Sequence, residues 1–198
     1  MPKMSNKEKG NFSNYLRIAG SLFLIASIMA LLLAVFNSLT KDRIAENTQK
    51  EIEATINGFF SEYGEVKSEL IETEIPDGCS VQSIYNVTTA DGAKLGYVAI
   101  CAPGGFKAAI DLAVGMEPDG KCREVSVISL SETPGVGAKV AEKAFTDGFK
   151  GESGELKVSK DGGTIDAVAG ATISSRAVTR GVNDALALVQ NIIGGEAK

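Results

Sequence analysis

The sequence contains no histidine, and this absence excludes several kinds of catalytic site. Without histidine a chain has no Ser-His-Asp triad, no Cys-His pair and no imidazole ligand for a metal ion. The sequence also lacks a GxGxxG turn and a GxxxxGK[ST] phosphate loop. The sequence therefore does not favour a hydrolase or a nucleotide-driven motor, and we expect no catalytic residue of these classes.

Cysteine is scarce and widely spaced. The three cysteines, Cys79, Cys101 and Cys122, show neither CxxC nor CxxxC spacing. Zinc and iron–sulfur sites usually need clustered thiolates, so no metal site is expected. An odd number of cysteines leaves open one disulfide outside the cytoplasm.

Basic residues do not dominate the chain, whose formal net charge is −5. Four basic residues and one acidic residue precede Lys41, which leaves 16 basic and 24 acidic residues in 41–198. A nucleic-acid-binding domain needs a basic surface. We therefore expect no nucleic-acid partner.

One long apolar run stands near the N-terminus. The nineteen residues from Ile18 to Phe36 carry no charge, and as a helix they would cover roughly 30 Å, the thickness of a bilayer core. The run is longer than the roughly 7 to 15 apolar residues of a signal peptide, and LLLAVFNSLT lacks a small-x-small cleavage site. Residues 18–38 are therefore predicted to form an uncleaved transmembrane helix.

The charges that flank this run predict its orientation. The end of a span that carries more basic residues tends to stay in the cytoplasm. This rule predicts a single-pass protein of the cell (inner) membrane, with residues 1–17 cytoplasmic and the C-terminal domain extracytoplasmic. The basic residues are Lys3, Lys7, Lys9 and Arg17 before the span, and Lys41 and Arg43 after it.

The span itself has no charged residue with which to conduct an ion. Small residues recur along it and suit close packing against partner helices, although a plain lipid-facing anchor explains the helix equally well. They are Gly20, Ser21, Ala26, Ser27, Ala30 and Ala34.

Residues 39–65 are predicted to form a juxtamembrane helix that ends at Gly64. Apolar residues recur there at intervals close to 3.6, which places them on one helix face. This face consists of Ile44, Ile52, Ile56, Phe59 and Tyr63.

Residues 66–198 are long enough for one domain with its own core. Two β-type runs, 83–89 and 94–100, flank an Ala-Asp-Gly turn, and two more, 108–116 and 122–130, flank a Pro-Asp-Gly turn. Such pairs are typical of hairpins and predict a small antiparallel sheet. Helical patterns at 138–149 and 175–193, with one or two short strands within 157–168, complete an α+β domain.

The stretch DAVAGATISSRAV, residues 166–178, gathers three hydroxyl groups where the last helix begins: Thr172, Ser174 and Ser175. The Ala169-Gly170-Ala171 turn allows close approach of a ligand. Free amides at a helix start suit a phosphate, and Arg176 and Arg180 could add positive charge. A simple N-cap by Ser174 or Ser175 is the alternative.

The segment D-x-V-A-G-A-T-I-S-S resembles the S/T-G-A-T-x-S/T motif of the bacterial FMN-binding domain family. In that family a flavin transferase uses FAD and magnesium to join FMN through its phosphate to the last threonine of the motif. The resemblance implies covalent FMN on Thr172. Ala169 departs from the usual Ser or Thr at the first motif position, but the accepting hydroxyl is retained.

A second segment, SETPGVGAKV, resembles the E-T-P-G-L-G signature of two branches of this family, with Val136 in place of Leu. One branch is the G subunit of the Rnf ion-translocating oxidoreductase, and the other is the C subunit of the sodium-pumping NADH:quinone oxidoreductase. The resemblance implies that the Glu132–Ala138 loop faces the isoalloxazine ring. The implied cofactor-binding residues are Glu132, Thr133, Pro134 and Gly135 at the ring, and Gly170, Ala171, Ser174 and Ser175 near the phosphate.

A length of 198 residues suits the Rnf branch better than the longer quinone-reductase branch. The resemblance then implies an electron-carrying flavoprotein of a membrane complex that couples ferredoxin/NAD electron transfer to ion translocation. Its partners would be the other Rnf-type subunits and, during maturation, the flavin transferase. Three alternatives stay open: an anchored module that binds a phosphate-bearing ligand reversibly, a protein of the quinone-reductase branch, and an FMN-binding domain of another membrane redox protein.

Overall fold

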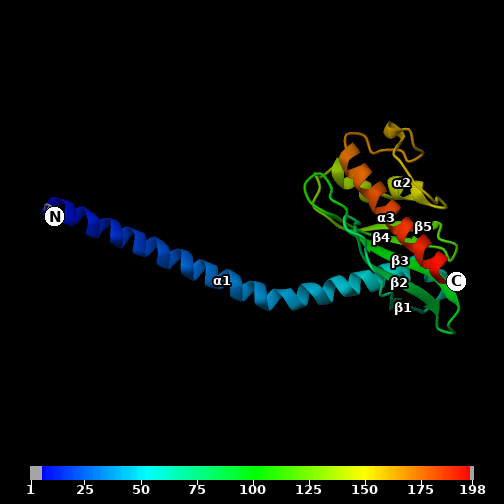
Figure 1. Ribbon diagram of the computed structural model, residues 1–198, viewed down its shortest axis with the longest axis horizontal. Coiled ribbons are helices and arrows are strands. Elements are labelled where there is room, and N and C mark those ends of the chain that lie inside the picture. Colours follow the sequence, from blue (N-terminus) through cyan, green and yellow to red (C-terminus); the bar gives the residue numbers. More distant parts are fainter. Residues whose placement is uncertain (1–5, 197–198) are drawn as a thin grey trace. The chain divides into compact units, whose positions relative to one another are not determined.

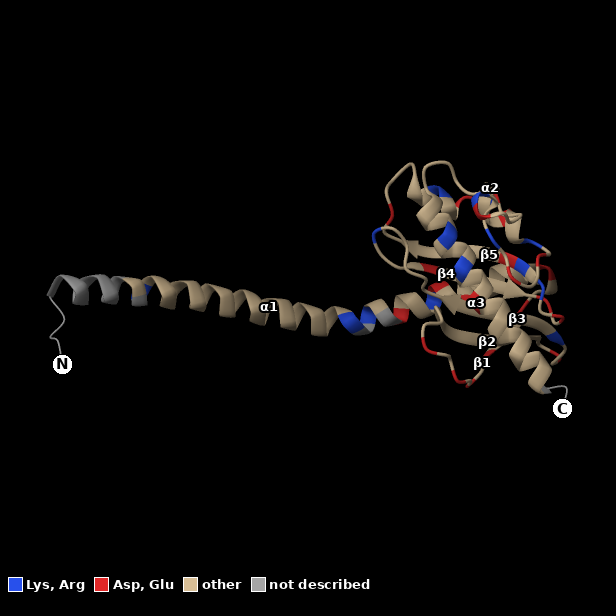
Figure 2. Cartoon of the chain, turned by 45° about the horizontal axis from the view of Figure 1, so that its top comes forward, with Lys and Arg blue, Asp and Glu red and all other residues tan. Residues whose placement is uncertain are grey.

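The computed structural model describes residues 6–196, which divide into two compact units, residues up to Gln49 and residues from Lys50 (Figure 1). Helix α1 (Asn6–Phe59) runs through the first unit and ends in the second. Because no residue between Ile18 and Phe36 is charged, Figure 2 shows a long uncharged stretch of this helix.

Within residues 6–196, one helix is long and apolar enough to cross a membrane, over Arg17–Phe59. Its large apolar side chains are exposed, with Phe23 at 75% and Leu33 at 67%. Exposure of so many apolar groups to water is unfavourable, whereas their burial in lipid is favourable. The helix therefore fits the predicted membrane anchor by length and composition.

The second unit is built on a five-stranded antiparallel meander in the order β1-β2-β3-β4-β5. Tight turns join β2 to β3 and β4 to β5, as the sequence predicts, and the α+β class with an antiparallel sheet is confirmed. The strands are β1 (Val66–Leu70), β2 (Val81–Thr89), β3 (Lys94–Cys101), β4 (Ile110–Met116) and β5 (Cys122–Leu130).

Alternate residues of the central strands feed two separate cores. On β4, Leu112 and Val114 point into the core shared with the C-terminal helix, whereas Ala113 belongs to the core on the opposite face. Both faces of β3 and β4 are covered, so these strands are nearly continuous apolar runs rather than alternating ones.

The end of α1 packs on one face of the sheet through Ile52, Ile56 and Phe59. A Cβ atom at Gly115 of β4 would lie 2.7 Å from the Phe59 ring, so only glycine allows this close approach. Two residues of the predicted apolar face are exposed, Ile44 by 62% and Tyr63 by 48%. The helix ends at Phe59, and a short 3-10 turn, η1 (Ser61–Tyr63), leads to Gly64.

Helix α3 (Thr172–Glu196) covers the other face of the sheet with Val178, Val182 and Leu186, among other residues. It is longer than the predicted 175–193 and continues through Gly194 and Gly195, so the prediction that these glycines end it is wrong. A Cβ atom at either position would meet no neighbouring atom, so no close contact requires glycine there. Glycine at these positions only lowers the helix propensity.

The segment between β5 and α3 differs from the sequence prediction in two places. The helix predicted over 138–149 is three short turns: η2 (Gly137–Ala141), α2 (Lys143–Thr146) and η3 (Asp147–Phe149). The strands predicted within 157–168 reduce to one parallel bridge between Val158 and Ile165, beside η4 (Ser159–Asp161). Strand β1 has no counterpart in the sequence prediction, because four of its five residues are exposed and show no apolar alternation.

Candidate functional site

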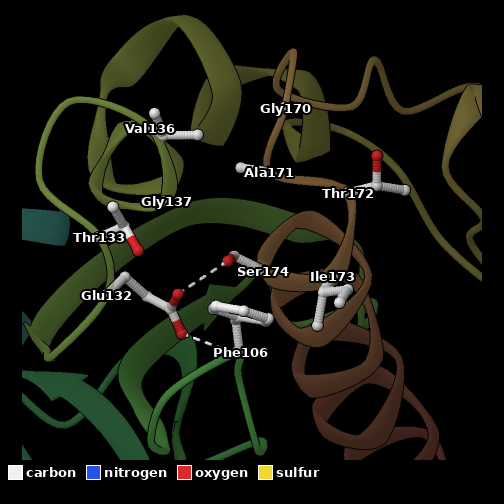
Figure 3. A pocket seen from close by; sticks show the side chains of 10 residues that line it. All are labelled: Phe106, Glu132, Thr133, Val136, Gly137, Gly170, Ala171, Thr172, Ile173 and Ser174. Atoms are coloured by element: carbon white, nitrogen blue, oxygen red, sulfur yellow. Dashed lines mark hydrogen bonds between the residues drawn. The ribbon is translucent and has the colours of Figure 1, made fainter.

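Three segments that are far apart in the sequence enclose one cavity of about 280 Å³ (Figure 3). Phe106 comes from the loop between β3 and β4, and Glu132–Gly137 follow β5. Gly170–Ser174 form the entry to α3. The two motifs singled out in the sequence therefore face each other across the same cavity.

The entry to α3 is a tight turn built from small residues. Gly170 has φ +79, a left-handed conformation that glycine adopts without strain. The Ala171 N–H donates to the Val168 carbonyl at 3.0 Å, which closes the turn. Ala171 then lines the cavity and is buried, so backbone and small side chains form this wall.

Ser175 secures this turn from inside the protein and does not line the cavity. Its fully buried hydroxyl accepts a hydrogen bond from the Val168 N–H at 3.0 Å and donates to the Ala171 carbonyl at 3.0 Å. Because α3 begins at Thr172, neither Ser174 nor Ser175 is an N-cap, and the capping alternative is wrong.

Glu132 is a buried carboxyl group that joins all three segments. Its Oε1 accepts hydrogen bonds from the N–H groups of Phe106 at 2.7 Å and Lys107 at 3.3 Å. Its Oε2 accepts from the Ser174 hydroxyl at 3.1 Å, and the residue is only 6% exposed (Figure 3). Three donors to one carboxylate compensate the cost of burying its charge.

Two glycines make room for this carboxylate. A Cβ at Gly105 would lie 2.3 Å from Oε1 of Glu132, and a Cβ at Gly137 would lie 2.9 Å from Oε2. Any larger residue at either position would displace Glu132 from its donors.

The Thr-Pro-Gly stretch forms a turn, as its composition suggests. Thr133 is half-buried and lines the cavity, and its carbonyl accepts from the N–H groups of Val136 at 3.3 Å and Ala138 at 3.2 Å. Pro134 and Gly135 are exposed and do not line it. Gly135 has φ +74, and the turn that it allows brings Val136 to the cavity.

Thr172 lies at the edge of the cavity, half-buried, as the first residue of α3. Its Oγ1 accepts a hydrogen bond of 2.9 Å from the ammonium group of Lys160 on η4. The hydroxyl thus combines a cavity position, partial exposure and a cationic neighbour.

The two arginines proposed from the sequence to add charge have other partners. Arg176 binds Asp161 through both carboxylate oxygens, at 2.7 and 2.5 Å. Arg180 donates to the Gly104 carbonyl at 3.2 Å. Neither side chain lines the cavity that holds Thr172.

Sequence reasoning gave no individual role to five residues of the site: Phe106, Val136, Gly137 and Ile173, which line the cavity, and Lys160, which contacts Thr172. Phe106, Val136 and Ile173 give the cavity an exposed apolar rim, with 62%, 40% and 52% of their surfaces accessible. Val136 and Ile173 sit inside the two motifs, so their neighbours signalled the place but not their role. Nothing local in the sequence signals Phe106 or Lys160, since both reach the site through tertiary contacts.

Two protein families match this chain. Residues 105–187 match the FMN-binding domain, which includes all the cavity segments, and residues 4–58 match the RnfG N-terminal region. The G subunit of the Na(+)-translocating ferredoxin:NAD(+) oxidoreductase complex of Acetobacterium woodii is 32% identical over 189 residues, covering 86% of this chain and 89% of the relative.

Other relatives carry related names. The G subunit of the ion-translocating oxidoreductase complex of Vibrio atlanticus is 31% identical over 80% of this chain and 82% of its own length. The G subunit of the proton-translocating ferredoxin:NAD(+) oxidoreductase complex of Clostridium ljungdahlii is 40% identical over 106 residues. That last alignment spans 52% of this chain and 57% of the relative, so it reports on about half of each protein.

Among solved structures, Shewanella oneidensis NqrC superimposes with a TM-score of 0.51 at 19% identity. The match covers 67% of this chain and 85% of that one. The likeness establishes a shared fold.

Proposed function

We propose that this chain, which belongs to the G-subunit family of ion-translocating oxidoreductase complexes, carries FMN covalently on Thr172 and relays electrons within such a complex. The family membership follows from identity over most of the length of both relatives. The cofactor class follows from the FMN-binding domain that spans the cavity.

One observation carries the site assignment. The segments 132–137 and 170–174 are remote in sequence, yet both contribute residues to one cavity, and the half-buried Thr172 stands at its edge. A hydroxyl buried in the core could not be reached by a modifying enzyme. A hydroxyl away from the cavity could not tether a flavin inside it.

The residues present fit FMN. The cavity of about 280 Å³ lies near the lower end of the range for ligand pockets, so it would enclose part of an FMN molecule and leave the rest at the surface. Phe106, Val136 and Ile173 offer apolar contacts for a flat ring, and Thr172 with Lys160 offers a polar end for phosphate. FMN supplies the electron transfer, and the protein supplies binding and orientation.

Attachment exchanges one phosphorus–oxygen bond for another. Thr172 Oγ1 would bond to the phosphorus of the FMN half of FAD in exchange for AMP, and its hydroxyl proton would pass to the released phosphate. No atom is oxidised or reduced in this step. The flavin transferase and its magnesium supply the catalysis, which agrees with a chain that has no histidine to act as a base.

Intact-mass analysis of the full chain, produced together with a flavin transferase, tests this proposal. We expect the mass of one phosphoester-linked FMN on the wild type, and none on Thr172→Ala. Thr164→Ala is the matched control, because Thr164 is an exposed threonine on the segment that leads to the turn. If Thr172→Ala retains flavin through denaturation, the attachment site is elsewhere.

The rival is an anchored module that holds a phosphate-bearing ligand reversibly in the same cavity. Covalent FMN leaves a fluorescent yellow band on a denaturing gel. A reversible complex loses its colour on dialysis or denaturation. The gel separates the two functions without any variant.

The proposal includes the topology expected from the flanking charges, with the N-terminus cytoplasmic and the flavin domain outside. The natural cysteines are poor probes, because Cys101 and Cys122 are buried and Cys79 is half-buried. We therefore suggest Ser153→Cys in a Cys79→Ala background, since Ser153 is exposed and does not line the cavity. We expect a membrane-impermeant maleimide to label this cysteine in intact cells. If the cysteine is labelled only after lysis, the predicted topology is wrong.

The proposal also places the chain in a multisubunit membrane complex of the Rnf type. One candidate membrane helix without a charged residue between Ile18 and Phe36 has no group to move an ion, so other subunits must do so. Mild-detergent purification should recover polytopic membrane partners. Recovery of this chain alone would contradict the assignment.

A further inference from the structure

We propose that Lys160 is the phosphate-binding cation of the attachment site and pairs with the phosphodiester formed on Thr172. This inference rests on the proposed function and deepens it, because neither sequence motif contains Lys160. With this assignment, the polar end of the site is formed by two segments, the turn that carries η4 and the entry to α3.

The contact already exists in the unmodified chain. Lys160 Nζ donates a 2.9 Å hydrogen bond to Thr172 Oγ1 across twelve positions of sequence. An ammonium group has three donors, so this bond leaves two for other acceptors. After attachment, Oγ1 becomes the ester oxygen, and the two non-bridging phosphoryl oxygens sit on the phosphorus bonded to it, within reach of the same ammonium.

The turn that carries Lys160 is held in place by contacts that do not involve Lys160. The Ser159 N–H donates to the Ile165 carbonyl at 2.7 Å, and the Gly163 N–H donates to the Val158 carbonyl at 3.1 Å. A Cβ at Gly163 would lie 1.9 Å from the Lys157 carbonyl oxygen, so the turn closes only with glycine there.

A bidentate ion pair fixes this turn against α3. Asp161, the neighbour of Lys160, binds Arg176, which lies one helical turn after Thr172. The planar fork of arginine suits a carboxylate and constrains its orientation. Arg176 therefore acts as a positioning residue that presents Lys160, rather than as a phosphate ligand.

Charge balance at the site also favours Lys160. A phosphodiester carries one negative charge, and the other charged residues considered near η4, the start of α3 and the cavity have partners of their own. Lys157 pairs with Glu155 at 3.1 Å, Arg176 pairs with Asp161, and Glu132 accepts bonds from its own three donors. Lys160, by contrast, directs its ammonium to Thr172 itself.

Phosphorus-31 NMR of the flavin-loaded full chain, in a phosphorus-free detergent, tests the pairing directly. A phosphodiester keeps one negative charge near neutral pH, so a difference in its resonance between two variants at the same pH reports a change in its surroundings. We expect the resonance of Lys160→Met to lie at a different chemical shift from that of the wild type.

Two further variants make the assignment specific. Lys160→Arg keeps a cation at this position, so its resonance should lie closer to that of the wild type than to that of Lys160→Met. Lys157→Met removes a neighbouring ammonium group and should leave the resonance at the wild-type position. The rate of flavin attachment by limiting transferase should fall about two- to fivefold in Lys160→Met, the effect of one exposed charge contact.

The outcomes separate this inference from the function on which it depends. A Lys160→Met protein whose phosphodiester resonance coincides with that of the wild type overturns the role of Lys160. A wild-type chain that shows no phosphodiester resonance, after exposure to transferase and FAD, overturns the covalent attachment instead.

Discussion

Glu132 and Ser174 lie 42 positions apart in the chain, and the Ser174 hydroxyl donates a 3.1 Å hydrogen bond to the buried Glu132 carboxylate. This bond ties the loop after β5 to the first turn of α3 across the cavity (Figure 3). The carboxylate is also the charged side chain among the cavity-lining residues. It therefore has two effects that experiments can separate, a structural one and an electrostatic one.

Glu132→Gln should raise the midpoint potential of the bound flavin with little loss of stability. The amide oxygen can still accept the two backbone N–H bonds, and the amide nitrogen can donate to the Ser174 oxygen. The variant loses the negative charge, which opposes electron uptake by on the order of 1–2 kcal/mol at several ångströms. Spectroelectrochemistry measures the shift, with the exposed Glu142→Gln as the control. Equal potentials in all three proteins would place the flavin far from Glu132.

Arg123→Met should lower the free energy of unfolding of the 50–198 unit by about 1–3 kcal/mol, the range for charge-assisted hydrogen bonds. Arg123 Nε donates to the Phe59 carbonyl at 2.9 Å, and its two terminal nitrogens bind Glu117 at 2.8 Å and Glu62 at 2.6 Å. The guanidinium also lies 4.9 Å from the centre of the Phe60 ring. Thermal unfolding in detergent measures the effect.

Arg43→Met provides the comparison for this prediction. Arg43 pairs with Glu46 at 3.5 Å on the surface of α1, and its side chain is 80% exposed. Surface pairs of this kind contribute about 0–1 kcal/mol. Equal losses in the two variants would mean that Arg123 does not hold the end of α1 to β5.

Acid should loosen the turn that carries Lys160. The hydrogen bond from Arg176 holds the pKa of Asp161 below its ordinary value. A carboxyl whose pKa is lower in the folded state stabilises that state above its unfolded pKa, and this contribution disappears as pH falls through the folded value. Amide protection factors for residues 158–165 should therefore decline below about pH 4. In Asp161→Asn they should be low already near neutrality, and an unchanged profile in that variant would contradict the role of the ion pair.

Cys101 and Cys122 should resist thiol reagents in the folded protein. Burial, the main cause, raises the pKa of Cys122 to about 12 and raises that of Cys101 further. The reactive thiolate is therefore scarce near neutral pH, and both side chains are closed to solvent. An Ellman titration should count at most one reactive thiol, from Cys79, in the native chain and three after denaturation. Full reactivity of all the cysteines before denaturation would contradict the packing described for β3 and β5.

The hairpins could be predicted because each depends on neighbouring residues. The Ala-Asp-Gly and Pro-Asp-Gly turns, with β-type runs on both sides, predict β2 to β5 close to their observed bounds. Strand β1 escapes such a prediction because its pairing with β2, rather than its own composition, makes it a strand. The 138–149 segment repeats apolar residues at helical spacing, but the fold breaks it into short turns around Phe145 and Phe149.

Local sequence by itself determined the apolar span, the hairpin turns and the place of Thr172 at the start of a helix, because propensity, hydrophobicity and turn chemistry act over a few consecutive residues. Only the tertiary structure decided which hydroxyl faces a cavity and which is buried, since Thr172 and Ser175 stand on the same helical turn with different surroundings. It also decided that Arg176 is engaged by Asp161 while Lys160 reaches Thr172. Such contacts join residues from different elements, so their geometry exists only once the sheet, the turn and α3 have packed together.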